Sequence, residues 1–134
     1  MSITIGVVKK QQKIFAEAGK GGATIYNHVT DTGINLKYIS TNPVTIYSIT
    51  AIGTTDNLIY LKLYNKATGM NPDVDSPLLI IPIPGNLKGA GVTISYPVGA
   101  DFSEGLCCLV VKGVADGDKN MVGAGSAIIN ITYK

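Results

Sequence analysis

The sequence predicts an all-β fold, a single-domain, jelly-roll-like antiparallel β-sandwich of about eight strands. Short runs of β-branched and aromatic residues recur along the chain and are separated by Gly, Pro, Asn and Asp, which is typical of strands joined by turns. Two long loops interrupt the series, and long loops mixed with tight turns favour a Greek-key or jelly-roll connection over a plain meander. A length of 134 residues suits one domain with its own core.

The N-terminal segment, residues 1–22, is interpreted as a first strand or an arm. Ser2 to Val8 alternates apolar residues with period two, as a strand does. Lys9 to Ala18 is the only stretch that could form a short helix; it contains good helix formers but no convincing cap, and it ends at Gly19.

Three strands are expected in the first half of the domain. Ala23–Thr30 and Ile34–Thr41 flank the turn signal Asp31–Gly33, so we expect them to form a hairpin. Val44–Ile52 is rich in β-branched residues and long enough to cross a whole sheet.

Leu58–Tyr64 has the clearest strand pattern in the chain. Ile59, Leu61 and Leu63 point to one side and should enter the core, because successive side chains in a strand alternate faces. The opposite face carries Tyr60, Lys62 and Tyr64 and is amphipathic, which makes it a candidate contact with a neighbouring subunit. The loop Asn65–Ser76 that follows is at the upper end of the lengths that compact domains use without a function.

The second half adds four strands. Prolines punctuate the apolar run Pro77–Pro84 and favour an edge strand. Leu106–Lys112 is apolar on both faces, which predicts a central strand. The remaining elements are a short strand Val92–Tyr96, a loop Pro97–Gly105 with Phe102 pointing inward, a long loop Gly113–Gly125 and a final strand Ser126–Tyr133.

The cysteines Cys107 and Cys108 are adjacent in the sequence. Neighbouring strand residues point to opposite faces, so the two are poorly placed to bridge each other. Buried free thiols in a reducing compartment are the favoured interpretation; a vicinal disulfide or a reactive thiol are the alternatives.

Composition favours a protein whose surface is partly covered by other chains. Charged residues make up 15% of the chain, against a typical share of about 25%. All 11 basic residues are lysines, and the net charge is +2. The absence of arginine, the preferred reader of phosphates and guanine edges, argues against nucleic-acid binding. No stretch approaches the ~18 apolar residues of a membrane span, and no signal peptide is recognised.

The sequence predicts no catalytic, cofactor or metal site. Asp116–Asn120 opens like a calcium loop, but Met121 and Ala127 stand where that loop needs its Gly and its Glu. A weak cation site shared with Asp73 and Asp75 is the alternative if the two long loops meet. The only histidine, His28, has no partner at ligand or triad spacing, and we expect no enzymatic activity.

Six segments of the second half of the chain, within roughly residues 55–134, form a recognisable set: Tyr60–Thr68, Asp75–Pro77, Ile81–Pro84, Phe102–Gly105, Ala115–Asp118 and Ile129–Tyr133. Together they resemble a group of small tailed-phage virion proteins of jelly-roll or β-sandwich type. A Cys pair stands where similar proteins have an alanine-rich strand. In such proteins the usual role is head decoration (cement) or another accessory part of the particle.

The resemblance implies a capsid decoration protein that is assembled in the host cytoplasm and sits on the capsid exterior. Its partner would be the major capsid protein. The decoration protein would form a homo-oligomer, a trimer at a threefold position, that bridges adjacent capsid subunits. The alternative is a glycan-binding module of the tail or fibre, which predicts clustered tyrosines and a cation between the loop aspartates. The candidate interface residues are Ile3, Ile5, Lys9, Lys10, Tyr60, Lys62, Tyr64, Met70, Asp73, Asp75, Asp116, Asp118 and Met121.

Overall fold

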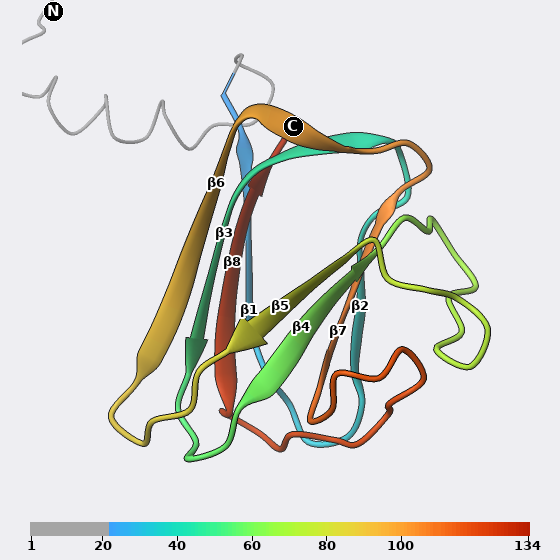
Figure 1. Ribbon diagram of the computed structural model, residues 1–134. Helices are drawn as coiled ribbons and strands as arrows, with labels where there is room; N and C mark the ends of the chain where they lie inside the picture. Colours follow the sequence, from blue (N-terminus) through green and yellow to red (C-terminus); the bar gives the residue numbers. More distant parts are fainter. Residues whose placement is uncertain (1–21) are drawn as a thin grey trace, which may run out of the picture.

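A computed structural model describes residues 22–134, which form a sandwich of two antiparallel four-stranded sheets (Figure 1). The predicted all-β sandwich of eight strands is therefore confirmed. This part of the chain has no helix, and hence none that could span a bilayer. The strands are β1 (Thr24–Val29), β2 (Asn35–Ser40), β3 (Val44–Gly53), β4 (Ile59–Tyr64), β5 (Leu79–Ile83), β6 (Ala90–Phe102), β7 (Leu106–Val111) and β8 (Ala127–Tyr133).

Successive strands mostly alternate between the two sheets. Sheet I has the order β1-β8-β3-β6, and sheet II has the order β2-β7-β4-β5. Within residues 22–134, β4 and β5 are the only consecutive strands that pair with each other, and a long loop joins them. The long loops that follow β4 and β7 leave opposite ends of these antiparallel strands, and both lie beside sheet II (Figure 1).

The predicted hairpin between the first two strands is wrong. β1 pairs with β8, and β2 pairs with β7, so the chain crosses from one sheet to the other between them. The fully buried Asn35 side chain fixes this crossing: its Oδ1 accepts the Asp31 N–H at 2.7 Å, and its Nδ2 donates to the carbonyls of Asp31 and Gly33. A local turn signal cannot distinguish such a crossing from a hairpin.

The main core lies between the sheets and contains the predicted inward residues of β4. Ile59, Leu61 and Leu63 are at most 2% exposed. β7 lies between β2 and β4 with every residue buried, so the predicted central strand is confirmed. β5 is an edge strand, as its prolines indicated: Pro82 is exposed on it, and the unpaired side of an edge strand needs no N–H donor.

β6 is longer than predicted and bends over one end of the sandwich. Its ladder with β3 is interrupted between the pairs Ser48–Ser95 and Ile46–Ala100 and then resumes to Phe102. The expected loop after Tyr96 is therefore largely strand. Pro97 is tolerated because it lies in the interruption, where no ladder N–H is required. Phe102 is 1% exposed and points into the core, as expected.

Gly99 makes this bend possible, and replacing it should destabilise the fold. Its φ is +87°, and a Cβ there would collide with the Thr45 methyl group. We expect Gly99→Ala to lower the free energy of unfolding by about 1–3 kcal/mol, since backbone strain and overpacking add. Urea unfolding would measure the loss. Gly69→Ala is the matched control, because its φ of +64° carries the strain without any neighbour within 4 Å; equal losses in both variants would contradict the packing argument.

The predictions for the N-terminal segment lie outside the described residues. These are the strand or arm at Ser2–Val8, the helix at Lys9–Ala18, and the interface candidates Ile3, Ile5, Lys9 and Lys10.

Candidate functional site

The two long loops, residues 65–78 and 112–126, fold over the outer face of sheet II; we call them the loop platform (Figure 1). Met70 from the first loop is 7% exposed and packs on this face. It completes a second apolar cluster whose other buried members are Tyr64, Cys107, Leu109 and Val111. The chain's own loops thus cover the central part of the outer face of sheet II, over β4 and β7.

This closure corrects the expectation of an open face on β4. Lys62 and Tyr64 are fully buried, and Met70 is nearly so, while Tyr60 is half-buried. The strand pattern gave their direction correctly. It carried no information on what covers them, because the covering residues are remote in sequence.

Lys62 ties the platform to the sheet. Its ammonium donates a hydrogen bond to the Ala115 carbonyl in the second loop. Burial lowers the pKa of Lys62 below the ordinary 10.5, and the carboxylates of Asp118 and Asp116 oppose this shift. A buried amine held by a loop carbonyl anchors the loop that supplies it.

The two loops also contact each other. Lys119 Nζ lies 2.9 Å from an oxygen of Asp73, so a salt bridge joins the two loops. A Cβ built on Gly117 would lie 3.7 Å from the Pro72 carbonyl oxygen, which places the two backbones side by side. The loops therefore form one surface.

The four aspartates that were expected to share a cation are not arranged as a cluster of metal ligands. Asp118 accepts from the Gly113 N–H at 2.8 Å and from Asn120 Nδ2, and Asp75 accepts from the Asn71 N–H at 2.8 Å. Asp73 pairs with Lys119, and Asp116 is exposed. No group of three His, Cys, Asp or Glu within residues 22–134 could hold a metal ion.

Cys107 and Cys108 are free and buried on opposite faces of β7, as predicted. Burial raises the pKa of each thiol to about 12. A reactive cysteine needs the opposite shift, because the thiolate is the nucleophile. The hydroxyl of Tyr64 beside Cys107 is buried without a hydrogen-bond partner, and burial raises its pKa to about 12.

His28 points between the sheets at the β1 edge. Its Nε2 lies 3.2 Å from Asn35 Oδ1, and its ring stacks on Tyr26 with centroids 6.4 Å apart. Since Asn35 Oδ1 already accepts the Asp31 N–H, it acts as an acceptor here as well, and His28 donates. These contacts help to hold the β1–β2 crossing and involve no nucleophile.

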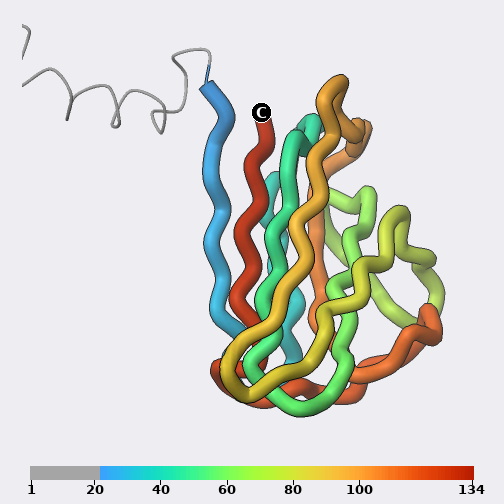
Figure 2. The backbone as a smooth tube through the Cα atoms, turned by 60° about the vertical axis from the view of Figure 1, so that its left-hand side comes forward, coloured from blue at the N-terminus to red at the C-terminus, as the bar shows by residue number. Residues whose placement is uncertain are grey.

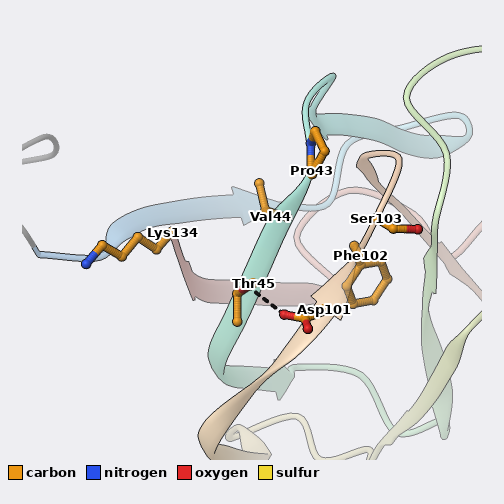
Figure 3. A pocket seen from close by; sticks show the side chains of 7 residues that line it. All are labelled: Pro43, Val44, Thr45, Asp101, Phe102, Ser103 and Lys134. Carbon is orange, nitrogen blue, oxygen red and sulfur yellow. Dashed lines mark hydrogen bonds between the residues drawn. The ribbon is translucent and has the colours of Figure 1, made fainter.

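One shallow hollow opens at the bent end of the sandwich (Figure 3). It has a volume of about 310 Å³ and is lined by the start of β3, the end of β6 and the C-terminal residue. Its carboxylate, Asp101, accepts a hydrogen bond from Thr45 Oγ1 at 2.7 Å. The hollow thus offers an apolar wall and a carboxylate that already accepts a hydrogen bond. These features make it a modest binding site for a small molecule.

The loop platform exposes large apolar side chains. Val74 is 76% exposed on the first loop, and Val114 and Met121 are 57% and 56% exposed on the second. Of the predicted interface candidates in the described residues, Asp73, Asp116 and Met121 lie exposed on this platform, and Asp75 and Asp118 are half-buried in it.

The outer face of sheet I is a second surface, which the sequence reasoning missed. No described loop crosses it (Figure 2), and Ile25 and Val29 on β1 are about half exposed. The four strands of sheet I contain one carboxylate, Asp101, and no lysine or arginine. Period-two alternation marked these side chains as outward, but only the topology shows that they form one face.

The seven tyrosines do not gather at one rim. They are distributed over six strands of both sheets, and Tyr26 and Tyr64 point into apolar clusters.

Compared with models of known protein families and with curated proteins, the chain has no significant match.

Proposed function

We propose that the protein is a structural component of a phage particle, a decoration protein on the capsid exterior that bridges copies of the major capsid protein. The observation that carries this proposal is the loop platform: two long loops, fixed to the sheet and to each other, that present exposed apolar side chains. Surface loops that are held this firmly and expose apolar side chains suit contact with another protein.

The segments that resemble phage virion proteins meet in this structure, which supports the proposal. Asn65 accepts from the Glu104 N–H at 2.8 Å and donates to Ser103 Oγ at 3.1 Å, so Tyr60–Thr68 holds Phe102–Gly105 in place. A Cβ on Gly105 would lie 2.7 Å from Ala67 Cα. Ala115–Asp118 receives the Lys62 ammonium. Residues remote in sequence thus build one platform.

The strand order gives further support. A jelly roll wraps eight strands into two sheets of four, with the chain passing repeatedly between them. The orders β1-β8-β3-β6 and β2-β7-β4-β5 follow this wrapping. We infer a jelly-roll domain of the kind that the resemblance implies.

In this proposal the platform stabilises the particle by burial. Val74, Val114 and Met121 would each contribute roughly 1–2 kcal/mol when covered by a capsid subunit, at about 25 cal/mol per Å². Each contact is small, but decoration repeats it over many sites of the lattice, and one copy bound across two subunits resists their separation.

Binding to capsids that lack the protein tests this function. The purified chain should co-sediment with such capsids and raise the temperature at which they open. Val74→Lys combined with Met121→Lys should weaken binding by about 100-fold, because two charges would be buried without partners.

The matched control is Leu87→Lys, which changes a side chain 69% exposed on the β5–β6 loop, away from the platform. It should bind capsids as the unaltered chain does. Absence of capsid binding by the unaltered chain would refute the proposal, and specific binding to host glycans instead would support a tail or fibre module.

A further inference from the structure

The outer face of sheet I, which no loop within residues 22–134 crosses (Figure 2), has three central rows that can meet another protein without burying a charge. The outward positions of these rows carry hydroxyls, amides and aliphatic groups, apart from Gly91, and Tyr47 and Asp101 lie outward beyond them, toward the bent end. Two hydroxyl pairs are already satisfied within the face: Ser48 Oγ lies 2.6 Å from Thr132 Oγ1, and Thr50 Oγ1 lies 3.2 Å from Thr93 Oγ1. Groups that bond to each other in this way cost less to remove from water.

Residue size differs across the central rows of the face, and Tyr47 on β3 lies outside these rows. The strand registers place its outward residues in three rows across β1, β8, β3 and β6. The β1 and β8 positions are mostly larger than the β3 and β6 positions of the same row. The rows are Ile25-Thr132-Ser48-Ser95, Asn27-Asn130-Thr50-Thr93 and Val29-Ile128-Ile52-Gly91.

We propose that a second copy of this chain covers this face, related by a twofold axis that runs parallel to the strands between β8 and β3. That axis lays β1 over β6 and β8 over β3 of the partner, row on row. Val29 then faces the bare backbone of Gly91, and Ile128 faces Ile52. Asn130 faces Thr50, so an amide without a side-chain hydrogen bond to any of residues 22–134 meets a hydroxyl. In the first and third rows the larger residues of each copy mostly meet smaller residues of the other, and each contact occurs twice, as in any isologous interface.

Area and charge both fit this partner. Four strands about 4.8 Å apart and about 24 Å long present on the order of 500 Å² per copy, or about 1,000 Å² in the pair. This is the lower limit for a specific interface, so the dimer should be in equilibrium with monomers at micromolar concentration. The three central rows carry no charge and meet their own copy without repulsion, so salt should have little effect on the dimer; the one carboxylate of the face, Asp101, lies at the bent end and accepts a hydrogen bond from Thr45.

The proposal goes beyond the function proposed above and does not depend on it. The loop platform lies on sheet II, on the opposite side of the sandwich (Figure 1). A dimer through sheet I would leave both platforms free and directed away from each other. Such a dimer would be able to bridge two partners. The sheet I face and the loop platform are nevertheless tested by different variants.

Sedimentation of the full chain over a range of concentrations tests the inference. The unaltered chain of 14.0 kDa should approach twice that mass. Thr50→Lys and Asn130→Asp, measured separately, should each weaken the dimer at least about 100-fold, because each would bury an unpaired charge. Thr41→Lys, on the exposed turn before β3, should leave the mass unchanged.

Mixing the two variants tests the register and shows that both are folded. Lys at position 50 of one copy would face Asp at position 130 of the other, so the mixture should regain the dimer at low salt. A monomeric or trimeric unaltered chain, or a dimer indifferent to Thr50→Lys, would overturn the proposal; so would a mixture that stays monomeric.

Discussion

Lys62→Ala should lower the free energy of unfolding by about 2–5 kcal/mol, the range for deleting a long buried side chain. The change removes a fully buried stem, which is paired across the sheet with Leu109 of the second apolar cluster, and the ammonium that holds the Ala115 carbonyl. Loss of that bond also releases the second platform loop. Amide hydrogen exchange should therefore increase first in residues 112–126, and capsid binding should weaken together with it.

Lys62→Met separates packing from charge. Methionine keeps most of the volume and buries no charge, so it should cost less than about 1.5 kcal/mol. It cannot donate to Ala115, so it should still speed exchange in the second loop. If Lys62→Ala left both the stability and the exchange of that loop unchanged, Lys62 would not be the anchor of the platform.

Raising the pH above 9 should destabilise the protein by several kcal/mol before pH 12. Burial raises the pKa of Cys107 and Cys108 from an ordinary 9.0 to about 12, raises that of Tyr64 from 10.0 to about 12, and raises that of Tyr26 further. In this window the unfolded chain releases protons that the folded chain retains. Stability present below pH 9 is therefore lost, by up to about 1.4 kcal/mol per pH unit for each group.

Lys62 has the opposite effect, because its lowered pKa gives a gain in stability as the pH rises toward 10.5. The two thiols and the two tyrosine hydroxyls act against this gain. Urea unfolding at several pH values would measure the slope. Tyr64→Phe removes a titrating hydroxyl that has no hydrogen-bond partner, so it should be nearly neutral at pH 7 and flatten the slope above pH 10. A slope that is unchanged in this variant would show that Tyr64 does not contribute.

Much of the fold was predictable because local patterns determine strands. Alternation in β4 located Ile59, Leu61 and Leu63 in the core, the prolines of β5 indicated an edge, and the two-sided apolar run of β7 indicated a central position. Each of these depends on residues within one strand, where the period of the side chains is fixed.

What sequence reasoning missed depends on contacts between distant residues. The crossing after β1 depends on the buried Asn35 amide, and the continuation of β6 depends on pairing with β3. The burial of Lys62 depends on loops that follow β4 and β7. The low charge of the outer face of sheet I was indicated by the low charged fraction of the chain, but only the strand order shows that these residues lie on one side.

Imaging phage capsids to which the purified protein has been added tests the proposed decoration role most directly. A reconstruction that resolves strands should show the sandwich on the outside of the head, with residues 65–78 and 112–126 against capsid subunits. Density for the protein at the tail tip or inside the head would contradict the account, as would a sandwich on the head whose loop platform faces solvent.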